Sequence, residues 1–113
     1  MSIQTNWAYE RATGGAGAIA AAFLGIDHVA IVDQIHLHAN AAMANEDMTI
    51  EIDSAINAAY DVHLDAFTTN GITDYTWIPD EPMSIAADEV LDVNCANTNN
   101  VTWGLTLNFR HET

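Results

Sequence analysis

Lysine is absent from this chain of 113 residues, and arginine occurs only twice, at Arg11 and Arg110. Sixteen Asp and Glu residues give a formal net charge of −14. A surface of this sign repels the phosphate backbone of nucleic acids, and counterion release cannot drive binding without Lys or Arg. The same repulsion disfavours attachment to an anionic membrane surface. We therefore expect no nucleic acid and no membrane among the direct partners.

The acidity itself has two interpretations. It can reflect adaptation to saline surroundings, where salt screens charges over about 10 Å or less and makes self-repulsion tolerable. It can equally be the ordinary solubility of a small acidic domain. Composition alone leaves both open.

Cysteine occurs once, at Cys95, so an intramolecular disulfide cannot form. Cys95 falls on the apolar side of its segment and is expected to be a small buried hydrophobic residue. No apolar run approaches the roughly 20 residues of a membrane span. Met1 to Tyr9 lacks the basic and apolar regions of a secretory signal, so none is predicted.

Catalytic groups are also scarce. The chain has three serines, and none lies in a strand–turn–helix elbow. Cys95 has no nearby Lys or Arg in the sequence to lower its pKa, and a phosphate-binding loop would need a lysine. We therefore predict no catalytic residue and no cofactor, and we expect the protein not to be an enzyme.

What the chain does have is an alternation of apolar and polar residues in short runs between Met48 and Phe109. A period of two places successive side chains on opposite faces of a strand. The last run places one apolar set on a single face: Val101, Trp103, Leu105, Leu107 and Phe109. Further strands are predicted at 18–24, 28–38, 48–53, 59–67, 72–78, 83–85 and 90–95. Asn70-Gly71 and Pro79 mark turns between them.

This pattern predicts an all-β fold, a single antiparallel β-sandwich or jelly roll of about seven or eight strands spanning residues 18–113. One predicted strand has a charged residue on its apolar face. The apolar face of the run 28–38 would also bury Asp33, so we expect a bulge at Asp33-Gln34 that releases this carboxylate to solvent.

Residues 1–17 differ from the rest and are predicted to be an extended N-terminal arm that ends in a glycine hinge. The arm carries Trp7, Tyr9 and Arg11, and these residue types are enriched at interface hot spots. They are the candidate interface residues. The alternative is a frayed terminus.

Two histidine patterns are candidate metal sites. His36 and His38 would point the same way from one strand, but no sequence feature identifies a third ligand, so solvent-facing histidines are the favoured interpretation. Asp61, His63 and Asp65 would line one strand face, where a flat strand supplies too few oxygens for calcium. We therefore predict no metal site.

Three tryptophans, at Trp7, Trp77 and Trp103, could form a platform on which a sugar stacks. Packing is the more common role for so few aromatic residues. Trp103 lies on the apolar face of the last run and is expected in the core.

Several segments between Ile50 and Arg110 resemble the small jelly-roll proteins encoded among the virion genes of tailed bacteriophages. The resembling segments are 50–54, Ala59-Tyr60-Asp61-Val62, Thr76-Trp77-Ile78-Pro79-Asp80, Asp88 before Leu91-Asp92-Val93, and Trp103-Gly104-Leu105 running to Arg110. The glycine-rich segment at 13–18 is similar to the start of such proteins. This chain departs from many of them in its acidity and in the alanine-rich segment 39–44.

The resemblance implies a capsid decoration or cement protein that binds the outside of an assembled shell and bridges neighbouring subunits. The implied partner is the major capsid protein or another virion protein. The implied state is a homo-oligomer, with a trimer favoured, and the implied location is the virion, with the capsid surface favoured over the tail. The alternatives are a tail or fibre component, a carbohydrate-binding β-sandwich module, and a metal-dependent cupin-like enzyme that uses His36 and His38.

Overall fold

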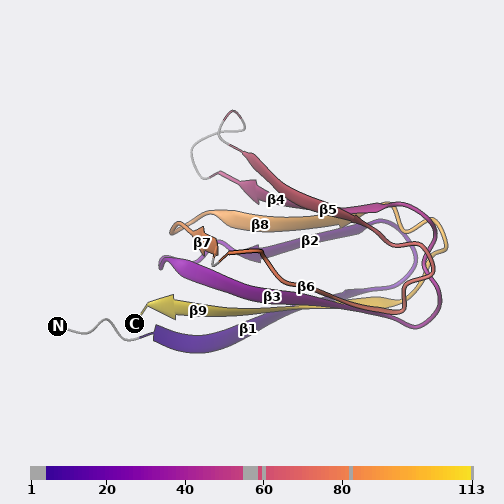
Figure 1. Cartoon of the computed structure of the whole chain (residues 1–113), viewed down its shortest axis with the longest axis horizontal. Helices are drawn as coiled ribbons and strands as arrows, with labels where there is room; N and C mark the ends of the chain where they lie inside the picture. The colour runs from indigo at the N-terminus through magenta and orange to yellow at the C-terminus, as the bar shows by residue number, and fades with distance from the viewer. Residues whose placement is uncertain (1–4, 55–58, 60, 82, 113) are drawn as a thin grey trace.

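The structure is a computed structural model that describes residues 5–54, 59, 61–81 and 83–112. Its strands form two antiparallel sheets that pack face to face (Figure 1). In strand order, the first sheet contains β1 (Thr5–Gly14), β9 (Trp103–Glu112), β3 (Ala30–Ala39) and β6 (Asp74–Trp77), and β7 (Met83–Ile85) also pairs with β3. The second sheet contains β2 (Ile19–Leu24), β8 (Val90–Cys95), β4 (Asp47–Asp53) and β5 (Val62–Thr68).

The strand pairing has the topology of a jelly roll. The first strand pairs with the last, β2 pairs with β8, β3 pairs with both β6 and β7, and β4 pairs with β5. The chain is thus a long hairpin that is rolled into two sheets, with β6 and β7 together in the place of one strand. The predicted all-β sandwich is confirmed. It has nine strands among the described residues, where seven or eight were expected.

The core lies between the two sheets and follows the predicted alternation. In β9, Trp103, Leu105, Leu107 and Phe109 are buried, and the residues between them are half-buried. Cys95 is buried, as expected, and burial raises the pKa of its thiol. No helix in the described ranges is both long and apolar enough to cross a membrane.

The predicted arm is largely part of the sandwich. Ten consecutive residues, Thr5 to Gly14, pair with β9, so β1 is an edge strand of the first sheet and not a separate arm. Residues 1–4 lie outside the described residues. The glycine segment after β1 leads into the second sheet, and Asn97 Nδ2 donates a hydrogen bond of 2.8 Å to the Gly17 carbonyl. The prediction was wrong because β1 finds its partner at the far end of the chain.

The bulge in β3 is confirmed, and it takes Asp33 out of the core, but only partly into solvent. The register of β3 on β9 shifts between Val32 and Gln34. The Asp33 side chain is 23 % exposed: its Oδ1 lies 3.1 Å from Arg110 Nη2, and its Oδ2 is buried. The bulge therefore brings an acid beneath the arginine of the neighbouring strand, an ion pair that links β3 to β9.

Candidate interaction surface

The outer face of the first sheet carries exposed aromatic side chains at its β1 edge. Trp7 is 71 % exposed and Tyr9 is 61 % exposed. In the register of β1 on β9, Trp7 lies opposite Arg110, Tyr9 opposite Asn108, and Arg11 opposite Thr106. We call Trp7, Tyr9, Arg11, Asn108 and Arg110 the aromatic face. Large aromatic rings left in water are the unusual feature here, since rings of this size are mostly buried in packed proteins.

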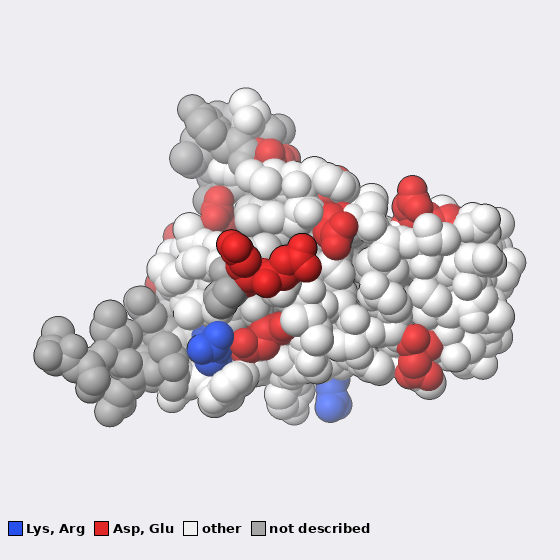
Figure 2. Space-filling model, viewed as in Figure 1, with Lys and Arg blue, Asp and Glu red and all other residues white. Residues whose placement is uncertain are grey.

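Both arginines of the chain lie against these rings. Arg110 Cζ is 5.2 Å from the centroid of the Trp7 ring, and Arg11 Cζ is 4.9 Å from that of Tyr9. Each contact is worth about 0.5–1 kcal/mol at an exposed site and restricts the ring. Figure 2 shows the two blue arginine patches along the lower part of the view, where the first sheet lies in Figure 1. All the permanent positive charge of a strongly acidic chain is thus gathered on one face.

A shallow hollow of about 490 Å³ lies beside these rings. Its lining combines aromatic, amide and carboxylate side chains: Trp7, Ala8, Tyr9, Asp33, Gln34 and Asn108. Asp33 Oδ2 and the adjacent Arg110 Nε are buried without a hydrogen-bond partner among the described residues. The sequence alone indicates Trp7, Tyr9 and Arg11 as interface candidates and indicates no such role for Gln34, Asn108 or Arg110. Gln34 and Asn108 reach the hollow, and Arg110 reaches the Trp7 ring, through strand register, which the sequence does not display.

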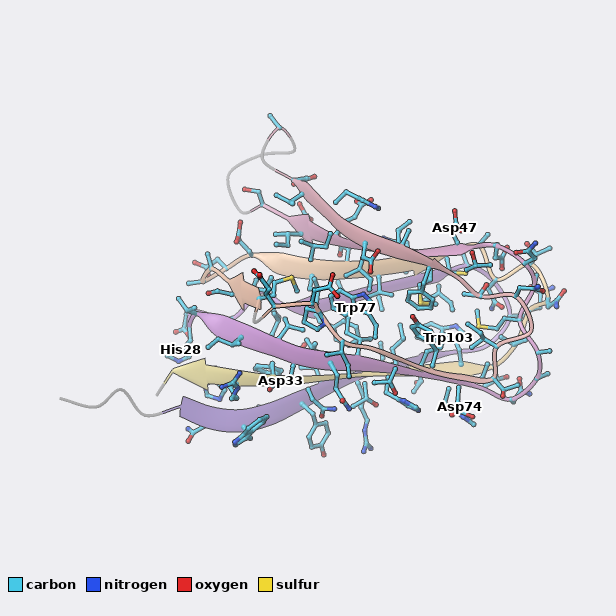
Figure 3. All side chains as sticks on the ribbon, viewed as in Figure 1. His28, Asp33, Asp47, Asp74, Trp77 and Trp103 are labelled. Carbon is cyan, nitrogen blue, oxygen red and sulfur yellow. The ribbon has the colours of Figure 1, made fainter. Side chains whose placement is uncertain are left out.

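His36 and His38 lie on the same sheet face, nearer the other end of β3. His38 Nδ1 is 2.8 Å from Asp74 Oδ1, and His36 Nδ1 is 2.9 Å from Thr76 Oγ1 (Asp74 is labelled in Figure 3). The hydrogen bond from His38 is the main reason that the pKa of Asp74 is lowered. Within residues 5–54, 59, 61–81 and 83–112, no group of three or more His, Cys, Asp or Glu is arranged to hold a metal ion.

The proposed row of Asp61, His63 and Asp65 does not form. The register of β5 on β4 shifts, so that His63 lies opposite Glu51 while Asp65 lies opposite the buried Ile50. Asp65 Oδ2 accepts a hydrogen bond of 2.8 Å from Trp77 Nε1, and this bond is the main reason that the pKa of Asp65 is lowered. The prediction assumed an unbroken period of two, which the irregularity interrupts.

The three tryptophans do not form the sugar platform that was the alternative to packing, and Trp103 is in the core, as expected. Trp77 is 6 % exposed and Trp103 is 8 % exposed, so both belong to the core. Figure 3 shows both labelled side chains between the two sheets. Gly14 lies opposite Trp103, and a Cβ added there would come within 2.7 Å of the indole. Glycine at position 14 therefore leaves space for the Trp103 ring.

The second sheet carries acidic groups on β4 and β8. Asp92 lies opposite Glu51, and its pKa is raised first by burial and then by the charges of Asp53, Glu51 and Asp61. An Asp with a raised pKa destabilises the fold wherever it is charged, and the penalty disappears as the pH falls through its folded pKa. This mutual repulsion is tolerable when salt screens it.

Replacing Asp92 by Asn (D92N) is therefore expected to increase the free energy of unfolding at pH 7, by a few tenths of a kcal/mol to about 1 kcal/mol in low salt. The increase should shrink as the pH is lowered into the carboxyl range and as salt is added. Urea denaturation at several pH values measures it. The control is D47N, since Asp47 is an exposed acid outside this group. A loss of stability at pH 7 for D92N would contradict the prediction.

Comparison with protein-family models and with curated proteins finds no match for this chain.

Proposed function

We propose that this chain is a non-enzymatic virion protein of the capsid decoration or cement type, which binds the outside of an assembled shell and bridges neighbouring subunits. The observation that carries the proposal is the aromatic face, where Trp7 and Tyr9 stand exposed beside both arginines of the chain. Tryptophan, tyrosine and arginine are the residues most enriched at interface hot spots. The resemblance to phage jelly-roll proteins supplies the class of partner.

The rings are suited to docking because each already lies against an arginine side chain before a partner arrives. Burying an aromatic side chain contributes about 1.5–3 kcal/mol relative to leaving it in water. Ordering a free side chain at an interface costs about 0.5–1.5 kcal/mol, and the arginines already hold these two rings. Most of the gain from burial is therefore available for binding.

The charge distribution suggests how the protein would be oriented on a shell. The aromatic face, with Arg11 and Arg110, would meet the shell, and the acidic side chains of the second sheet would face the medium. A protein that binds only the assembled shell stabilises that shell by mass action. If one copy of this chain made a second contact with an adjacent shell subunit, it would link the two subunits.

Replacing Trp7 by Ala (W7A) is expected to weaken binding to assembled particles by about 30-fold or more, the effect of a hot-spot residue worth 2 kcal/mol. The measurement is co-sedimentation of the purified chain with particles that lack it. The matched control is V62A, because Val62 is an exposed apolar residue on β5 of the other sheet. Binding of W7A at the wild-type level would remove the proposal. Hundreds of copies per particle would support a capsid location, and a few would indicate the tail.

A carbohydrate-binding function is the second candidate, and the hollow beside Trp7 and Tyr9 favours it. Sugar rings stack on exposed aromatic side chains, and amide and carboxylate groups such as those of Gln34 and Asp33 bond to hydroxyls. Trp7 is exposed while Trp77 and Trp103 are buried, so a change in tryptophan fluorescence on adding a polysaccharide would report on this hollow. A saturable response that W7A abolishes would favour the sugar. No response would favour shell binding.

A further inference from the structure

The β1 edge of the first sheet is unusually open to pairing. Among the described strands, β1 is hydrogen-bonded only to β9, and its ten residues pair without a register shift. Natural edge strands are usually blunted by charged side chains, lysine above all, by proline, by a bulge or by short length. Thr5–Gly14 has no lysine, no proline and no bulge, and its two charged side chains are already engaged, Glu10 with the Leu24 N–H and Arg11 with the Tyr9 ring.

The other sheet edges are protected. The opposite edge of the first sheet consists of two short strands, β6 and β7, with Pro79 in the segment between them. In the second sheet, the edge strand β5 is interrupted by a register shift. At the β2 edge, Glu10 Oε1 accepts a hydrogen bond of 3.0 Å from the Leu24 N–H. Among the described strands, only β1 presents a long and regular edge, so pairing through it would stop at two copies.

A second copy of β1 fits this edge better with a two-fold axis at Tyr9 than with one at Glu10. If two sheets join with their outer faces on the same side, a two-fold axis runs between the two β1 strands, perpendicular to the sheet. One residue of β1 then lies opposite the same residue of the other copy, and the axis is named here by that residue. An axis at Tyr9 places Tyr9 opposite Tyr9 and Trp7 opposite Arg11 of the other copy. An axis at Glu10 would set two glutamates opposite each other, and like charges in that position are destabilising.

We propose that two copies of this chain pair antiparallel through β1, about a two-fold axis at Tyr9, so that their first sheets form one continuous sheet. The pairing places each Trp7 between Arg110 of its own chain and Arg11 of the other copy, so that cation–π contacts cross the junction. Main-chain hydrogen bonds along 5–13 hold the two edges together.

This pairing goes beyond the proposed shell attachment and does not depend on it. The dimer would carry two aromatic faces side by side, and two linked sites can bind a repeated surface far more strongly than one. Each copy has a formal net charge of −14, so repulsion opposes association. Added salt should therefore strengthen the dimer, because screening reduces that repulsion.

Cysteine cross-linking of the full chain tests the register. Opposite Cα atoms in an antiparallel pair are about 4.5–5.5 Å apart, within reach of a disulfide. Y9C alone should form a covalent dimer on mild oxidation. W7C alone and R11C alone should not, because the two copies of either residue would be offset by four residues, about 13 Å along the strands. A mixture of W7C and R11C should give a heterodimer.

The wild-type chain is the control, since its single cysteine, Cys95, is buried. Light scattering on the wild type should also show a dimer whose fraction increases with concentration and with salt. A monomer at every concentration, together with no cross-link in any combination, would overturn the proposal. Efficient cross-linking between two W7C chains through position 7 would also overturn the proposal, because that cross-link indicates another register. Particles are absent from these experiments, so their result is separate from that of the shell-binding test.

Discussion

Replacement of Ile50 by Ala (I50A) is expected to lower the free energy of unfolding by about 2–5 kcal/mol. Ile50 is completely buried at the middle of β4, where it lies opposite Val93 of β8. The loss combines the hydrophobic transfer of the deleted methyl and methylene groups with the cavity that remains. Domains of this size have a free energy of unfolding of only about 5–15 kcal/mol, so the I50A loss is a large fraction of the total.

Urea denaturation of I50A measures the effect, and I78A is the matched control. Ile78 is 63 % exposed, so the same truncation there should change stability by no more than about 0.5 kcal/mol. Equal losses for the two variants would show that the alternation does not separate core from surface as described.

The second large effect is expected at a polar residue in the core. Asn97 is 1 % exposed, its Nδ2 donates to the carbonyls of Gly17 and Val101, and its Oδ1 accepts from the Val101 N–H. N97A would remove these bonds and leave buried backbone groups without partners, at a cost of about 2–4 kcal/mol. Its φ of 53° adds to the loss, because alanine adopts this conformation less readily than asparagine.

Thermal or urea denaturation of N97A measures this loss. N99A is the control, because Asn99 is exposed and its side chain donates one hydrogen bond, to the Ala42 carbonyl. N97G separates the two causes: it accepts the positive φ but lacks the amide, so it should remain strongly destabilised. If N97A keeps wild-type stability, the connection between β8 and β9 does not depend on this residue.

Much of the fold was predictable from local signals. The run that ends at Phe109 alternates strictly, and its apolar residues are the buried side of β9. Asn70-Gly71 was predicted as a turn from residue type, and Gly71 has a φ of 72° there. The bulge at Asp33 followed from a charged residue on an apolar face. Each of these features depends on residues a few positions apart.

Edge strand β1 was missed because its partner is remote. Its inward positions include the small residues Ala8 and Ala12, whereas its large rings, Trp7 and Tyr9, face solvent. This pattern resembles an unpaired segment until β9 is placed beside it. Arg110 of the aromatic face and Gln34 of the adjacent hollow were missed for the same reason, since they come from strands β9 and β3 and not from β1.

The sequence by itself determined which side chains are buried in most strands, because a period of two is a property of neighbouring residues and needs no knowledge of the partner strand. It also singled out Trp7, Tyr9 and Arg11 by their chemistry. Only the tertiary structure decided that they lie on a paired edge strand, that Asp33 lies beneath Arg110, and that Trp77 is buried against Asp65. Strand order and register depend on contacts across the whole chain, and a single bulge can change which face a side chain joins.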